Sequence, residues 1–141
     1  MSNTNNKSTV ALVQCDSYDN DKVYKAITKA IELICVLDLL INKKILVKPN
    51  LLSGSDPNEA ITTNPAVFEA VLKYLKENGY SNIAYGDSPS GISNMEEVVR
   101  VAGVKQRAKK YDVPLWDFNN FQIVNNPNGN IAKKLLYVKA W

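Results

Sequence analysis

The run from Asn82 to Gly91, which reads NIAYGDSPSG, constrains the fold of this chain more than any other stretch. Ile83 and Tyr85 are β-formers two residues apart, whereas the glycines and the proline that follow cannot continue a strand. The chain must therefore turn at this point. We predict a short strand that ends at the turn and presents Asp87 at its end.

Ser93 and Glu96 follow this turn with the spacing of a capping box, which predicts that a helix begins near residue 94. A strand, a turn and a helix in this order form a site for phosphate or another anion, because free backbone N–H groups and a helix N-terminus converge there. The polar side chains at this place are Asp87, Ser88 and Ser90. The alternative is that Asp87 and Ser88 only satisfy hydrogen bonds of their own turn.

Segments with strand and helix patterns alternate three times along the chain. Thr9–Cys15 is apolar and partly β-branched, which predicts a strand covered on both faces. Further strands are predicted over 44–48, 83–85 and 113–118, and helices over 22–41, 65–78, 94–102 and 104–111. Because βαβ crossovers are right-handed, we predict an α/β fold with an open, mainly parallel sheet and helices on both faces. Residues 121–124 and 133–138 predict a C-terminal β-hairpin.

Polar residues follow each predicted parallel strand. The carboxyl ends of parallel strands meet at one edge of an open sheet, and ligands bind at that edge. A lysine opposite an aspartate there would hold a phosphate or a carboxylate, or the acid would bind Mg²⁺ while the lysine balances a substrate charge. We expect a small anionic or metal-bound ligand to be bound by Asp16, Lys48, Asn50, Thr63, Asn64, Asp87, Ser88 and Ser90.

The length of 141 residues and the hydrophobic content of 45% suit one domain. We predict a disordered tail over residues 1–8, which are polar, and a single α/β domain over residues 9–141. The net charge of +3 comes from scattered lysines, which gives nucleic-acid binding no positive support. The sequence contains no apolar signal segment and no run long enough to span a membrane, so we expect a cytoplasmic protein with no membrane partner.

The chain contains no histidine, which excludes Ser-His-Asp and Cys-His chemistry. Cys15 and Cys35 fall in predicted core elements, where reduced thiols are ordinary. Two cysteines cannot hold an iron–sulfur cluster or a four-ligand zinc site alone, so we expect no cofactor in this chain. The cations between Lys105 and Lys110 are interpreted as a solvated helix face.

The segments ILVKPNLL, TTNPAVFEAVLKYLKENG and YGDSPSG occur in this order and follow an opening that reads VALVQCDSYDNDKVYKAITKAIEL. Together they resemble the family called domain of unknown function 362 (DUF362), over residues 9–140. Members of that family are commonly linked to ferredoxin-like iron–sulfur modules. The resemblance therefore implies the ligand-binding α/β portion of an iron–sulfur-associated redox protein, with a 4Fe-4S cluster in a C-terminal region missing from this chain.

Three departures from the family pattern are visible. Asn64 stands where the family usually has a histidine, in Thr-Thr-Asn-Pro. The link CVLDLLINKK lacks the Gly or Pro turn expected before the second strand. The chain also stops at Trp141, before the Asn-Leu-Pro-Lys-type strand and the cysteine-rich motif that similar members often carry. We interpret the chain as the N-terminal part of a longer protein.

A second hypothesis is a non-catalytic binding or assembly module, or a truncated homologue without activity. No catalytic residue is assigned under either hypothesis, and whether the protein is an enzyme stays open. If the sheet continues beyond this chain, the apolar C-terminal residues are left without a partner. We then expect a homodimer or other association through the C-terminal edge, at Leu135, Leu136, Val138 and Trp141.

Overall fold

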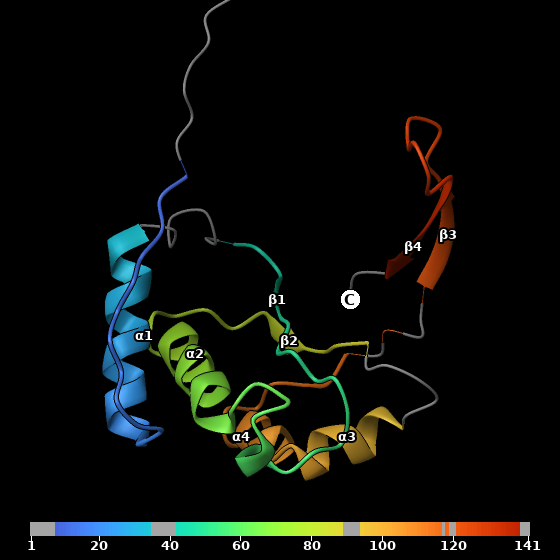
Figure 1. Ribbon diagram of the computed structural model, residues 1–141. Helices are drawn as coiled ribbons and strands as arrows, with labels where there is room; N and C mark the ends of the chain where they lie inside the picture. The colour runs from blue at the N-terminus through green and yellow to red at the C-terminus, as the bar shows by residue number, and fades with distance from the viewer. Residues whose placement is uncertain (1–7, 35–41, 89–93, 117, 119–120, 139–141) are drawn as a thin grey trace, which may run out of the picture.

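The computed structural model describes residues 8–34, 42–88, 94–116, 118 and 121–138, which form a mixed fold of helices and strands (Figure 1). The helices are α1 (Asn20–Ile34), the short 3-10 helix η2 (Pro57–Glu59), α2 (Pro65–Glu77), α3 (Met95–Val101) and α4 (Val104–Lys110). The strands are β1 (Ile45–Val47), β2 (Ile83–Tyr85), β3 (Phe121–Asn125) and β4 (Lys134–Val138).

The strands β1 and β2 form a small parallel sheet, with Ile45 opposite Ile83 and Val47 opposite Tyr85. On its other side, β2 is joined by a single parallel bridge between Tyr85 and Leu115. The predicted strand over 113–118 is therefore wrong in extent, since among the residues of this segment that the structure describes only this bridge is observed. Pro114 has no backbone N–H to donate, which limits the ladder at this place.

The core lies on one face of this sheet. Ile45, Ile83 and Tyr85 pack there against apolar residues of α2, α3 and α4, and the rings of Phe68 and Tyr85 lie 5.3 Å apart between centroids. On the opposite face Leu46 is 39% exposed, whereas its partner Ala84 is fully buried. The described helices α2, α3 and α4 thus cover one face, whereas helices on both faces were predicted. The physical reason is that successive right-handed crossovers that advance in the same direction all leave their helices on the same side.

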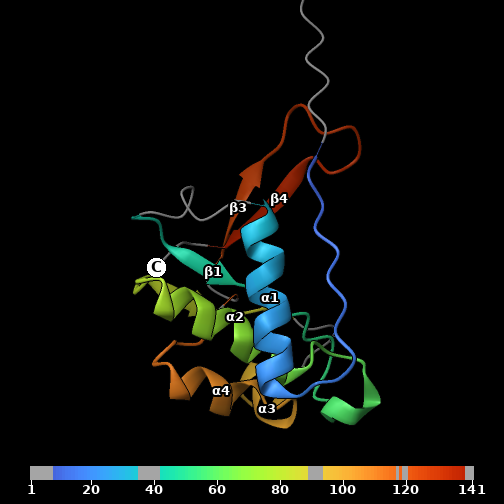
Figure 2. The ribbon, with the colours of Figure 1, turned by 90° about the vertical axis from the view of Figure 1, so that its left-hand side faces the viewer.

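The helix α1 packs on α2 and not directly on the sheet, as the two views in Figures 1 and 2 show. A second cluster of buried residues lies between these helices and contains Val23, Ala66 and Ala70. The Asn64 carboxamide caps α2 by accepting a hydrogen bond of 2.9 Å from the Ala66 N–H, and Pro65 follows at the first helical position. The predicted start of this helix is confirmed.

The helix α3 begins after Asn94, whose side chain accepts a hydrogen bond of 3.0 Å from the Glu96 N–H. Asn94 is therefore the N-cap of this helix, and Ser93, predicted for that role, lies outside the described residues. Gly103 separates α3 from α4 with a φ of 72°, a left-handed conformation that favours glycine. The predicted break of the helix at Gly103 is confirmed.

The segment Thr9–Cys15 is not a strand, which corrects the prediction for this part of the chain. It runs alongside α1 (Figures 1 and 2), and Val10 and Leu12 are 85% and 96% exposed. An apolar, partly β-branched run forms a strand only where a neighbouring backbone supplies hydrogen bonds, and α1 offers none. Of the predicted tail, residues 1–7 lie outside the described part of the chain.

The strands β3 and β4 form the predicted C-terminal hairpin, with Phe121 opposite Val138 and Asn125 opposite Lys134. Its strands differ from the predicted bounds by one residue each, so this prediction is confirmed. In Figure 1 the hairpin lies at the upper right, away from the helices. Phe121, Ile123 and Leu135 are 43%, 62% and 44% exposed.

Candidate functional site

The ends of β1 and β2 meet in an ion pair. The Lys48 Nζ lies 2.5 Å from the Asp87 Oδ1, one residue beyond β1 and two beyond β2. The two partners differ in burial, because the side chain of Lys48 is 57% exposed and that of Asp87 only 5%. The parallel pairing explains why they meet, since both strands point their carboxyl ends in the same direction.

The Asp87 carboxylate also accepts two backbone hydrogen bonds. The Ser88 N–H donates to Oδ1 at 2.8 Å, and the Leu51 N–H donates to Oδ2 at 2.6 Å. Burial alone would raise the pKa of Asp87, but the hydrogen bonds from Lys48, Leu51 and Ser88 outweigh it and hold the pKa below its ordinary value. Asp87 is therefore an anion at neutral pH, and its hydrogen bonds join the segment that follows β1 to the segment that follows β2.

Asn50 and Thr63 form a second link next to this ion pair. The Asn50 N–H donates to the Thr63 Oγ1 at 3.0 Å, and the Thr63 N–H donates to the Asn50 carbonyl at 2.9 Å. This reciprocal pair closes the long loop that leads from β1 to α2. The two links are adjacent in the chain, because Asn50 contacts Thr63 while the N–H of the next residue, Leu51, contacts Asp87.

The structure thus brings Lys48, Asp87 and Ser88 together, and Asn50, two residues after Lys48 in the chain, is joined to Thr63. Asn64 follows Thr63, but its side-chain oxygen is used as the cap of α2.

Asp16 is engaged elsewhere, in an exposed ion pair of 3.0 Å with Lys22. Its expected place beside Lys48 depended on the strand at residues 9–15, which is not formed. Ser90, which was predicted to lie at the same edge, is outside the described residues.

Two features of this site were missed by the sequence reasoning. The first is the backbone N–H of Leu51, which no side-chain pattern could reveal. The second is Thr62, which is 8% exposed and whose hydroxyl has no hydrogen-bond partner among the described residues. The signal for Thr62 was present in the Thr-Thr pair at 62 and 63, of which only the second threonine was selected.

Gly86 directly precedes Asp87 and packs closely against Trp116 and Phe118. A Cβ at this position would lie 2.6 Å from the Phe118 Cε1 and 2.8 Å from the Trp116 carbonyl oxygen. The Gly86 N–H donates to the Val47 carbonyl at 3.2 Å, which extends the pairing of β1 and β2 by one residue. Glycine at 86 is therefore required by close packing and not only by a turn.

A second buried carboxylate lies away from this site, on α2. Glu69 is 5% exposed and pairs with Arg107 and Lys110 of α4, the latter at 2.6 Å. Burial would raise the pKa of Glu69, but the hydrogen bond from Lys110 and the charge of Arg107 lower it overall. The interpretation of the α4 cations as a purely solvated face is thus wrong for these two, which join α4 to α2.

The described parts of the chain contain no helix that is long and apolar enough to cross a bilayer. Among the same residues, no group of three or more His, Cys, Asp or Glu side chains is placed to hold a metal ion.

The fold and the contacts define an α/β protein whose polar groups gather where two parallel strands end. The chain belongs to the family described as Domain of unknown function (DUF362), whose family model matches residues 45–140. It is also similar to a thylakoid-associated protein of Synechocystis sp., with 26% identity over 112 residues, which cover 78% of this chain and 34% of the relative. The chain therefore spans about a third of the length of that relative. No solved structure matches it. A cytoplasmic location stays a prediction.

Proposed function

We propose that the ends of β1 and β2 bind a small anionic ligand, and that this chain is the ligand-binding α/β portion of an iron–sulfur-associated redox protein. The observation that carries the first part is the Lys48 ammonium, which is held by the buried Asp87 while its side chain stays 57% exposed. The second part rests on the resemblance of the chain to its family.

An anion fits this place because a protonated lysine has further N–H donors besides the one directed at Asp87. The exposed side chains of Asn50 and Ser88 flank the same strand ends and supply additional donors. Asp87 orients the ammonium group, so less side-chain entropy is lost when a phosphate or a carboxylate is bound.

A metal ion held directly by Asp87 fits less well. The Asp87 Oδ1 already contacts Lys48 and the Ser88 N–H, and the Oδ2 already accepts from the Leu51 N–H. A metal ligated by this carboxylate would have to compete with these donors. A ligand that brings its own metal ion, with its anionic group on Lys48, avoids that competition.

The cysteines of this chain are too few to hold an iron–sulfur cluster. Such clusters are held by several Cys thiolates, and the sequence contains only Cys15 and Cys35. The Cys15 thiol lies at an exposed position and donates to the Ser17 carbonyl at 3.2 Å, whereas Cys35 is outside the described residues. A cluster would need ligands from a further segment, so no redox step is assigned to this chain.

The anion site is tested by titrating the 141-residue chain, labelled with ¹⁵N, with inorganic phosphate and with citrate. We expect saturable shifts of the backbone amides of Lys48, Asn50, Leu51 and Ser88. The Lys48→Gln variant should weaken the apparent affinity at least about tenfold, because a charge-assisted hydrogen bond is lost. Lys48→Arg should retain most of it.

The matched control is Lys109→Gln, which removes an exposed cation from α4 and should leave the titration unchanged. Equal losses in Lys48→Gln and Lys109→Gln would mean that the anions respond only to net charge. The absence of a saturable shift with either anion up to about 10 mM would contradict the proposal.

A second candidate function, association, is favoured by the exposed apolar side chains of the hairpin. Phe121 and Ile123 lie on the same face of β3, because they are two residues apart in a strand. A two-stranded hairpin with such a face is marginally stable alone and is stabilised when the face is covered. We propose that this face binds a second copy of the chain.

A further inference from the structure

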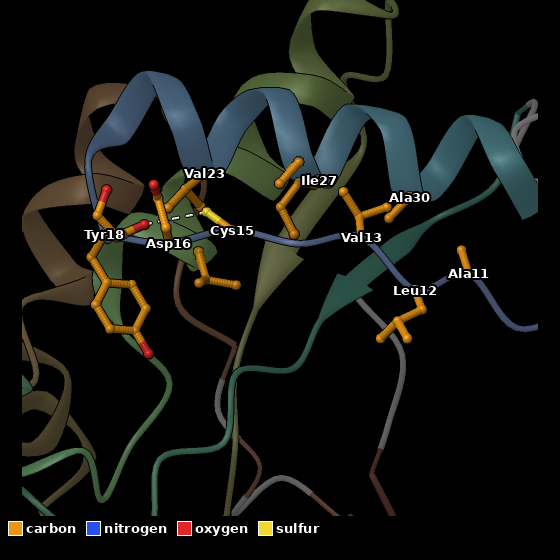
Figure 3. A pocket seen from close by; sticks show the side chains of 12 residues that line it. Ala11, Leu12, Val13, Cys15, Asp16, Tyr18, Val23, Ile27 and Ala30 are labelled. Carbon is orange, nitrogen blue, oxygen red and sulfur yellow. Dashed lines mark hydrogen bonds between the residues drawn. The ribbon is translucent and has the colours of Figure 1, made fainter.

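Residues 9–15, which we call the N-terminal strap, have the composition of a strand but lie beside α1 (Figure 3). Ala11 and Val13 are partly buried, and Leu12 is almost fully exposed. An apolar cavity of about 580 Å³ remains between the strap and its neighbours, and Val23, Ile27 and Ala30 of α1 line it. The strap is therefore not closely packed where it lies.

The strand β1 has an open edge within the part of the chain that the structure describes. It pairs only with β2, through bonds such as the Ile45 N–H to the Asn82 carbonyl and the Gly86 N–H to the Val47 carbonyl. Neighbouring residues of a strand direct their backbone groups to opposite sides, so the N–H and C=O of Leu46 face the open edge. Such an edge accepts an additional strand.

The order of the helices indicates which segment of the chain is expected at the open edge of β1. The helix α2 connects β1 to β2, and α3 with α4 connect β2 to the bridge residue Leu115. The helices α1 and α4 both pack against α2, so the helix layer begins with α1. When right-handed crossovers advance in one direction, the helices follow one another across the layer in the same order as the strands across the sheet. Because α1 comes before α2 in the helix layer, a strand next to β1, on the edge away from β2, is expected below α1.

We infer that the N-terminal strap, observed beside α1, also adopts a second position in which it forms a parallel strand on the open edge of β1, with α1 as the crossover helix. The chain between Cys15 and Ile45 contains far more residues than a parallel crossover needs. The strap then has two positions, one beside α1, as observed, and one closed on β1. The closed position gives the apolar residues at 10–13 a sheet to pack on.

Closure has a consequence for the candidate site. A parallel strand over residues 9–15 ends at the same edge as β1, so Asp16 would follow it as Lys48 follows β1. Both side chains of the ion pair between Asp16 and Lys22 are exposed to solvent. An ion pair of this kind opposes the movement of the strap onto β1 only weakly.

Amide hydrogen exchange of the 141-residue chain without ligand tests the closed position. A strap beside α1 leaves its amides without backbone partners, whereas a strap on β1 protects every second amide and the Leu46 N–H. We expect exchange at least about tenfold slower at these amides than at Ile131, an exposed loop residue. Unprotected exchange throughout 9–15 would overturn the inference.

A pair of proline variants supplies the matched control. Leu12→Pro and Val13→Pro remove neighbouring amides, of which only one can face β1. An edge strand tolerates proline at the outward amide and not at the inward one, so one variant should lose the protection and the other should keep it. Equal protection in both variants, or protection that rises with protein concentration because straps are exchanged between copies, would contradict closure within one chain.

Discussion

Asp87 is the residue whose ionisation matters most to the candidate site. Its pKa is lower in the folded chain than in the unfolded chain, so its contribution to stability is complete above the unfolded pKa of about 4 and is lost as the pH falls through the folded pKa. We expect Asp87→Asn to lower the free energy of unfolding at pH 7 by about 1–3 kcal/mol.

Denaturant unfolding between about pH 7 and pH 2 measures this effect. The stability of Asp87→Asn should fall less steeply than that of the wild type as the solution becomes acidic. Parallel pH profiles for the two proteins would show that the Asp87 carboxylate is not stabilised in the folded chain.

Gly86 is a second residue whose role can be measured directly. We expect Gly86→Ala to lower the free energy of unfolding by about 1–3 kcal/mol, because the added methyl group would overlap Phe118 and the Trp116 carbonyl. Gly54→Ala is the control, since its Cβ would meet Val101 at an ordinary distance of 3.7 Å. If thermal unfolding shows the same loss of stability in both variants, the close packing at Gly86 is contradicted.

At the scale of elements, Glu69 joins α2 to α4. We expect Glu69→Gln to lower the free energy of unfolding by about 1–2 kcal/mol, because the buried charged hydrogen bonds to Arg107 and Lys110 are lost. The matched control is Glu96→Gln, which breaks an exposed ion pair with Lys105 and should change stability by less than about 0.5 kcal/mol. Chemical denaturation of both variants checks the difference, and equal effects would contradict it.

The elements best predicted from sequence were those specified by local signals. The Asn-Pro start of α2, the break at Gly103 and the C-terminal hairpin follow from caps, backbone freedom and alternation within a few residues. The segment Thr9–Cys15 and the strand over 113–118 were mispredicted, because pairing in a sheet depends on distant partners that local patterns do not contain.

The same distinction separates the parts of the candidate site. Lys48 and Asp87 were predicted at one sheet edge, because strand ends are visible in the sequence. The participation of Leu51 was not, since it acts through a backbone N–H that contacts a residue 36 positions away. The use of the Asn64 oxygen as a helix cap shows that a polar residue near a site can have a purely structural task.

At the scale of the whole molecule, the hairpin determines whether copies associate. We expect the wild type to show a larger apparent mass in light scattering as its concentration rises, and Ile123→Lys to reduce this effect by placing a charge on the exposed apolar face of β3. The control is Ile131→Lys, which changes an exposed loop residue of the same hairpin. A monomeric wild type at every concentration, or equal effects of both variants, would contradict association through this face.

The link between Asn50 and Thr63 also bears on how this protein can change in length. Because the two ends of the loop are bonded to each other, its tip around η2 can grow without separating β1 from α2. Doubling the length of a flexible loop costs only about 0.6 kcal/mol in closure entropy. Among the described connections, this loop is therefore the place where homologous chains can accept insertions, and where a reporter peptide can be introduced while the strand ends stay in place.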